Sequence, residues 1–459
     1  MIRGSRRTRV TAIAALTGLA LFATPITGPA QAGPTTTAPT YAVGKGSDSG
    51  TGHVGWWYDK LKVGRAHAEA TGAGVTVAVI DGSIDPSVAE LQGVDLTRRV
   101  DCDGNRVPIR SGSLDDHGTL MSALIAGTGR GNGPGGAGVR GIAPDAKLLF
   151  YGIDTAIEPG AKLFYECDGY NSPGLVRDAV KRGADVISIS IGGLGGDWFK
   201  RALKAARDKG AVVVASSGDA SANGLGVESP ARFPGVVAVN AVDRNAKPWR
   251  YNPAVSIVRK PIAEIKEGFP VISAPGVDLK TLRWRDGGWH SDAPATGTSP
   301  ATALVSGALA LVKQKYPEAT GNQLIQNLIH FTGGTRAYSF DREYGFGIVS
   351  LEKMLDHDPT GWPDENPLLK GPAAAVKDYP MSAYQAPSPS PAAQTPSASP
   401  APSAAPPPSA AQSEAESDGP AAGLWFLIGA GVLVVGAAVV FISFRRRRSP
   451  ASLPSQSEV

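Results

Sequence analysis

Short apolar runs alternate with helix-like segments through the middle of the chain. Five runs rich in Val, Ile and Ala predict β-strands. They lie at residues 75–80, 147–151, 186–190, 212–215 and 236–240. Helix-like segments fall between and after them, at 173–183, 197–209, 298–316 and 320–331. Strands that are apolar on both faces are typical of a parallel sheet with helices on each side, so the pattern predicts an α/β fold.

Both ends of the chain differ from this middle part. Residues 1–32 hold four Arg, an apolar run and a small-residue cleavage site, which predicts an export signal; an uncleaved anchor is the alternative. Residues 423–444 are 22 residues without a charge. They predict one transmembrane helix, with a buried core helix as the alternative. The four Arg that follow place the tail, 445–459, in the cytoplasm and the body outside the cell membrane.

Composition and charge separate the remaining segments. Of the 37 Pro in the 459 residues, twelve lie between Pro372 and Pro420. Residues 358–420, rich in Pro, Ala and Ser, are therefore predicted to be an extended linker. This leaves an N-terminal extension at 33–73 and a folded domain at 74–357. Without the Arg-rich ends the body has a net charge of −3, which argues against nucleic acid as a partner.

Three residues suited to acyl transfer stand where predicted elements begin or end. Asp81 follows the first predicted strand, His117 opens a helix-like run, and Ser299 stands at the start of another helix. A serine hydroxyl is a weak nucleophile until an imidazole takes its proton, and a carboxylate orients that imidazole. The order Asp, His, Ser differs from that of α/β-hydrolases, and no Gly-x-Ser-x-Gly motif surrounds Ser299, which argues against an esterase.

Motifs around these residues resemble those of the subtilisin-like serine proteases over about residues 74–350. They are Val77-Ala-Val-Ile-Asp81, His117-Gly-Thr119, Gly141-Ile-Ala-Pro144, Ser190-Ile-Gly-Gly193, Ser273-Ala-Pro-Gly276 and Gly297-Thr-Ser299. The resemblance implies a subtilisin-like, mainly parallel twisted sheet and an endopeptidase whose triad is Asp81, His117 and Ser299. We expect no cofactor. Calcium binding by the Asp-rich stretches near 101–103 and 115–116 is an alternative to solvated loops, and we assign no metal.

The resemblance also assigns substrate-binding residues. Ser190, Ile191 and Gly192 are expected to form an edge that pairs with an extended protein or peptide substrate by strand addition; a core strand is the alternative.

The whole layout is similar to that of the mycosins, membrane-anchored subtilisin-like proteases of actinobacterial type VII secretion. Both have a signal, a short extension, a protease domain, a Pro-rich linker, one span and a basic tail. The resemblance implies a partner complex in the secretion membrane; a degradative wall protease is the alternative. In an exported protein we expect Cys102 and Cys167 to form a disulfide, with two free buried thiols as the alternative.

One position departs seriously from the family pattern. Asp219 stands where the family has an Asn whose amide donates a hydrogen bond to the oxyanion. An ionised carboxylate accepts instead and repels the developing charge, and losing one donor costs about 10²–10³ in turnover. A protonated Asp219 would donate, but its pKa would have to rise well above about 3.9. The sequence thus leaves two hypotheses, an active protease and a weak or inactive protease-fold scaffold that stabilises a secretion complex.

Overall fold

The computed structural model describes eight stretches of the chain. They are residues 55–98, 116–153, 172–194, 196–219, 227–249, 264, 268–334 and 338–387. The predicted signal, both cysteines, the predicted span and the basic tail lie outside these residues. Of the helices that the structure describes, none has the length and apolar character needed to cross a membrane.

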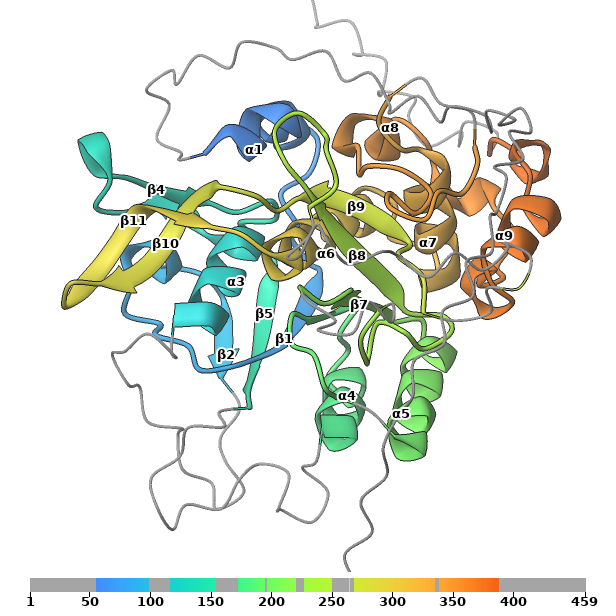
Figure 1. Cartoon of the computed structure of the whole chain (residues 1–459), viewed down its shortest axis with the longest axis horizontal. Helices are drawn as coiled ribbons and strands as arrows, with labels where there is room; N and C mark the ends of the chain where they lie inside the picture. Colours follow the sequence, from blue (N-terminus) through green and yellow to red (C-terminus); the bar gives the residue numbers. More distant parts are fainter. Residues whose placement is uncertain are drawn as a thin grey trace, which may run out of the picture. The chain divides into compact units, whose positions relative to one another are not determined.

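A seven-stranded parallel sheet forms the centre of the described structure (Figure 1). Its strands, in spatial order, are β2 (Leu96–Arg98), β5 (Lys147–Gly152), β1 (Thr76–Asp81), β6 (Val186–Ile189), β7 (Val212–Ser216), β8 (Val237–Val242) and β9 (Ile272–Pro275). Every ladder between them is parallel. The five predicted strands correspond to β1, β5, β6, β7 and β8, and the predicted α/β fold with a parallel sheet is confirmed.

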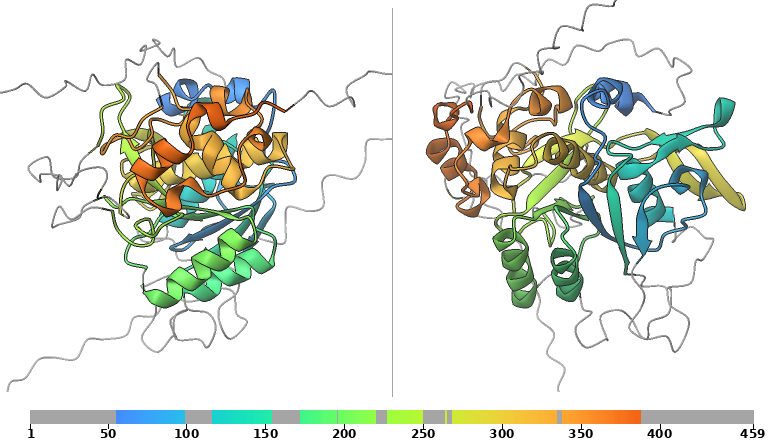
Figure 2. Two further views of the ribbon diagram at one scale, coloured as in Figure 1. Left: turned by 90° about the vertical axis from the view of Figure 1, so that its right-hand side faces the viewer. Right: turned by 180° about the vertical axis from the view of Figure 1, so that it is seen from behind.

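Helices cover both faces of this sheet. They are α3 (Asp116–Ala126), α4 (Ser172–Lys181), α5 (Asp197–Asp208), α6 (Thr298–Lys315) and α7 (Gly321–His330). Helices α4 and α5 lie side by side on one face, and α3, α6 and α7 lie on the other (Figure 1, Figure 2). In α5 the buried residues Phe199, Ala202 and Ala206 share one side of the helix, since they are three and four residues apart. Helix α6 is buried on nearly every side, so it is the central helix of the domain.

Two antiparallel hairpins accompany the sheet, and the apolar-run pattern did not predict them. One consists of β10 (Leu279–Arg285) and β11 (Gly288–Ala295), the other of β3 (Thr128–Arg130) and β4 (Ala137–Arg140); short 3₁₀ turns occur at Ala89–Leu91 and Pro134–Gly136. The turn between β10 and β11 is Asp286-Gly287, both with positive φ, as a two-residue hairpin loop requires. Trp289 donates to Asp85 (2.8 Å) and holds this hairpin against the domain.

The segment before β1 is packed onto the domain. It forms the short helices α1 (Trp56–Lys60) and α2 (Val63–Ala66), and the side chain of Trp57 is fully buried. Lys62 and Arg65 both form ion pairs with Glu352 on α8 (Leu351–Leu355). At least this part of the predicted extension is therefore part of the folded structure.

The folded structure also continues past residue 357, where composition places the start of the linker. The added turns are Pro359–Gly361, Pro367–Leu369, α9 (Pro372–Asp378) and Met381–Ala383. Trp362, Leu368 and Ala375 are buried, and Trp362 stacks on His330 of α7 (3.9 Å between ring centroids). The packing of these apolar side chains holds the segment in a folded conformation, although its Pro content predicted an extended linker. The described fold therefore reaches residue 387.

Candidate active site

The predicted site residues meet at the carboxyl edge of the sheet. Strands β1 and β6 are parallel neighbours, with Ile80 opposite Ile189. Asp81 follows Ile80 and Ser190 follows Ile189, so Asp81 and Ser190 lie side by side at the end of the two strands. Strand β7 is the next neighbour and leads to Asp219. Side chains at the ends of adjacent parallel strands gather at this edge, which is where open α/β sheets bind their ligands.

His117 and Asp81 form a buried pair. His117 lies in the first turn of α3, and its Nδ1 is 2.6 Å from Oδ1 of Asp81, which also accepts the Gly82 N–H (2.7 Å). Asp81 is fully buried, whereas 37% of the His117 side chain is exposed. An ionised carboxylate only accepts, so Nδ1 carries the proton and Nε2 has the lone pair of a base. The backbone N–H of Gly82 thus supports the carboxylate.

Ser299 lies in the first turn of α6, next to the edge segment. Its Oγ donates to the carbonyl oxygen of Ser190 (2.8 Å), and the Ser190 hydroxyl donates to the carbonyl oxygen of Ser299 (3.2 Å). The Ser299 hydroxyl therefore has to turn before an imidazole takes its proton. Its backbone N–H lies in the first helical turn, where N–H groups have no partner within the helix. That group is suited to bind an anion.

Asp219 binds the beginning of α6. Its Oδ1 accepts hydrogen bonds from the backbone N–H (2.6 Å) and the hydroxyl (2.8 Å) of Thr298. Its Oδ2 lies against Gly297, where an added Cβ would approach it to 2.6 Å. A negative charge at a helix N-terminus is favourable because of the helix dipole. Asp219 thus acts as a hydrogen-bond acceptor that stabilises the N-terminal end of α6. The Ser299 N–H, which an oxyanion would bind, belongs to the same helix end.

The predicted substrate edge continues the line of β6. That strand ends at Ile189, one residue before the predicted end. Ser190 is buried, Ile191 is half-buried and Gly192 is exposed. The segment thus runs from beside Ser299 to the surface. Strand addition along it stays a prediction.

Glu228 also belongs to this region, although no sequence motif marks it. Its side chain packs against Gly192 and Gly218, where added Cβ atoms would come to 2.2 Å from Oε2 and 2.6 Å from Cδ. Burial raises the pKa of Glu228, and the negative charge of Asp219 adds to the rise. One signal was available, because Asp219 and Glu228 are the only charged residues between Lys209 and Arg232.

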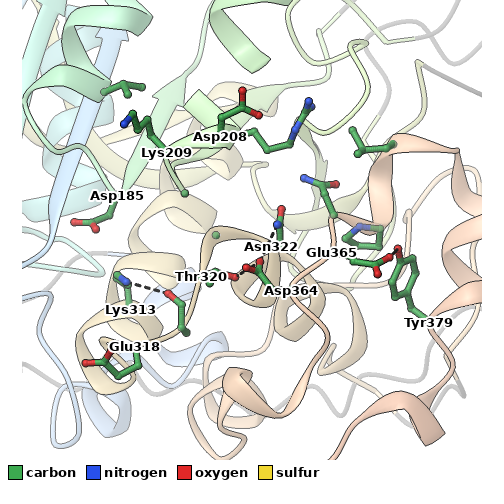
Figure 3. Close-up of a pocket in the computed structure, with 18 of the residues that line it drawn as sticks. Asp185, Asp208, Lys209, Lys313, Glu318, Thr320, Asn322, Asp364, Glu365 and Tyr379 are labelled. Atoms are coloured by element: carbon green, nitrogen blue, oxygen red, sulfur yellow. Dashed lines mark hydrogen bonds between the residues drawn. The ribbon is translucent and has the colours of Figure 1, made fainter. Parts of the chain in front are cut away.

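A polar hollow of about 800 Å³ lies elsewhere, between the end of α5, the start of α7 and the segment that leads to α9 (Figure 3). Asp364 accepts hydrogen bonds from Thr320 (2.6 Å) and Asn322 (2.8 Å), and Tyr379 donates to Glu365 (2.8 Å). The two bonds to Asp364 join the C-terminal segment to the start of α7, and the bond from Tyr379 to Glu365 lies within that segment. None of the residues that line the hollow belongs to the predicted triad.

Comparisons with known proteins agree with this geometry. The model of the subtilase family matches residues 72–347. Fervidolysin from Fervidobacterium pennivorans is 29% identical over 306 residues, which are 62% of this chain and 41% of its own length. Mycosin-1 from Mycobacterium tuberculosis is 30% identical over 348 residues, which are 66% of this chain and 73% of its own length. A crystal structure of MycP1 from the ESX-1 type VII secretion system superposes with a TM-score of 0.54 at 26% identity, over 72% of this chain and 91% of the other.

Proposed function

We propose that this chain, which belongs to the subtilase family and is a serine protease related to the mycosins, is an endopeptidase with Asp81, His117 and Ser299 as its triad. The hydrogen bond between His117 and Asp81 (2.6 Å), at the same sheet edge as Ser299, carries this proposal. Full burial of Asp81 supports it, because an unscreened carboxylate orients the imidazole strongly.

The geometry supports a two-step acyl transfer. The Ser299 hydroxyl turns from the Ser190 carbonyl towards Nε2 of His117, which takes its proton as Oγ attacks the scissile carbonyl carbon. The carbonyl oxygen becomes an anion, and the Ser299 N–H stabilises it. His117 then gives the proton to the leaving amine. Water enters by the same general-base route and releases the acyl group from Ser299, while Asp81 stabilises the imidazolium in each step.

Similarity to a mycosin and the layout of the chain support a cellular setting. We place the protease domain outside the cytoplasm, after cleavage of the signal 1–32, tethered by the helix 423–444 and followed by the cytoplasmic tail 445–459. The Cys102–Cys167 disulfide and the association with a type VII secretion complex belong to the same proposal. The shared layout and the 30% identity to Mycosin-1 support it.

A fluorophosphonate probe tests the catalytic part directly. This reagent phosphonylates only a serine that a neighbouring base has activated. The full-length protein is expected to be labelled, and Ser299→Ala and His117→Ala are expected to be blank while melting at the wild-type temperature. Labelling that persists in Ser299→Ala would show that another residue reacts. A wild-type protein that stays unlabelled, together with an unlabelled Asp219→Asn, would contradict the catalytic proposal.

A scaffold role is the second candidate, and the state of Asp219 favours it. Its carboxylate is held on α6 by Thr298. The resemblance to the family implies an assisting amide at this residue, and this chain has none there. The test compares cells that lack the chain with cells that carry Ser299→Ala. Secretion restored by Ser299→Ala would support the scaffold, and secretion restored only by wild type would exclude it as the main role.

A further inference from the structure

Two glycines beside the candidate active site both face the side chain of Glu228. Gly192 follows β6 and Gly218 follows β7, and these strands are parallel neighbours with Ile189 opposite Ala215. The two backbone segments therefore leave the sheet side by side. Neither has a side chain, and Glu228 from a separate segment lies between them. Its Oε2 faces Gly192, and its Cγ, Cδ and Oε1 face Gly218.

This gap is where a bound peptide would place one side chain. The carbonyl that Ser299 attacks has to lie beside the Ser190 carbonyl, 2.8 Å from Oγ, with its oxygen near the start of α6. The residue that supplies this carbonyl then stands between the 190–192 segment and the segment that ends at Asp219. Side chains on an extended strand point alternately to its two faces, and we place the side chain of this residue on the face towards Gly192, Gly218 and Glu228.

Glu228 brings an uncompensated negative charge to this gap. Within the described stretches, no hydrogen bond or ion pair reaches its side chain, and the one charge that shifts its pKa is the carboxylate of Asp219. Glu228 is half-buried, so solvent screens it only in part. Two carboxylates without a cation make the gap favourable for a positive group and unfavourable for a negative one.

We propose that Glu228 determines the primary specificity of this protease by binding a Lys or Arg side chain of the residue directly before the scissile bond. The inference rests on the proposed function, because it takes the substrate position from Ser299. Because Glu228 fills the space between Gly192 and Gly218, a cationic side chain would approach that space from the substrate side and bring its charged end to the carboxylate. A charge-assisted hydrogen bond of this kind corresponds to about a 10- to 100-fold preference over an uncharged side chain of equal length.

Peptide binding to the full-length Ser299→Ala protein tests the inference without requiring turnover. The probes are six-residue peptides that differ only in the fourth residue, which is Lys, norleucine or Glu. Lys and norleucine have nearly the same shape, so the comparison isolates the ammonium group. We expect the Lys peptide to bind about 10- to 100-fold more tightly than the norleucine peptide and the Glu peptide to bind most weakly.

Glu228→Gln, made in the Ser299→Ala protein, keeps the shape and removes the charge. It is expected to bring the Lys and norleucine peptides to within about threefold, whereas Glu318→Gln, an exposed acid that lines the polar hollow, is expected to change nothing. Equal binding of Lys and norleucine by the unmodified pocket would overturn the inference. So would a preference for Lys over norleucine that Glu228→Gln leaves unchanged, because the carboxylate would then only fill the gap.

Cleavage of the same peptides by the wild-type chain separates the two proposals. A Lys preference in binding, without Ser299-dependent cleavage of any peptide, would refute the proposed function and uphold the pocket. Ser299-dependent cleavage at equal rates after Lys and norleucine would uphold the protease and refute the role of Glu228.

Discussion

Replacing Asp219 by Asn is expected to speed the reaction of Ser299 strongly while costing little stability. The Asn carbonyl oxygen keeps the place of Oδ1, so it still accepts the Thr298 N–H and hydroxyl. The amide nitrogen takes the place of Oδ2 beside Gly297 and supplies a donor where the wild type has a negative charge. Among the heavy atoms, only Oδ2 is replaced, and the hydrogen-bond acceptor there becomes a donor.

The magnitudes decide which effect dominates. One oxyanion donor is worth about 10²–10³ in turnover, or roughly 3–4 kcal/mol. The lost attraction between the carboxylate and the N-terminus of α6 is worth about 0.3–1 kcal/mol, since Asp219 is exposed. A change of that size lowers the melting temperature of a domain this large by a few degrees at most. Faster chemistry should therefore be seen in a protein that is almost as stable.

The assay is the rate constant of fluorophosphonate labelling, measured for full-length wild type, Asp219→Asn and Asp219→Ala, with Asp286→Asn in the β10–β11 turn as a matched control. We expect Asp219→Asn to react about 10²–10³-fold faster than wild type. Asp219→Ala, which removes the charge without adding a donor, should lie between them, and the control should equal wild type. Equal rates for Asp219→Asn and Asp219→Ala would refute the reasoning, because the amide would then make no contact with the oxyanion.

Three further predictions concern individual residues. Gly297→Ala places a Cβ about 2.6 Å from Oδ2 of Asp219 at a φ of 154°, so fluorophosphonate labelling should fall more than tenfold; wild-type labelling would show that Asp219 gives way without disturbing Ser299. Trp362→Ala should lower the free energy of unfolding in urea by about 3–5 kcal/mol, whereas an unchanged value would mean that the segment after residue 357 adds nothing to the fold. Burial and then the charge of Arg140 lower the pKa of His67, which contacts the Ile142 carbonyl (2.9 Å). As the pH falls below about 6.5, His67 of the unfolded chain binds a proton, whereas His67 of the folded protein stays neutral. The stability contribution of His67 is therefore fully present above that pH and is lost as the pH falls towards the folded pKa. His67→Gln should reduce the difference in urea midpoint between pH 7 and pH 5, and an unchanged difference would assign the loss to other groups.

Much of the fold follows from local pattern. The central strands are apolar on both faces, so runs such as 75–80 and 212–215 mark β1 and β7 to within one residue. The hairpin of β10 and β11 mixes Trp, Arg and Asp with apolar residues, and its pairing depends on a partner strand that local pattern does not show. The turns after residue 357 are rich in Pro, and only the packing of Trp362 shows that they are folded.

The candidate site divides in the same way. Asp81 and His117 stand in short motifs, and their hydrogen bond confirms that the two side chains meet. The role of Asp219 at the start of α6 depends on Thr298, which is 79 positions away, and such a contact is invisible to a local pattern. Glu228 matters only because two glycines from other segments leave room for it. Residues whose role comes from long-range contacts require the structure.

The ion pairs that join α2 to α8 have a consequence for the order of folding. Lys62 and Glu352 are 290 positions apart, and closing a flexible loop of that length costs about 5 kcal/mol of chain entropy. Exposed ion pairs return about 1 kcal/mol or less, so they cannot start folding and form only after the sheet has brought the two helices together. A contact that forms after the folding barrier acts on the unfolding rate alone. The α2–α8 contact is therefore expected to slow the unfolding of the domain and to leave its folding rate unchanged.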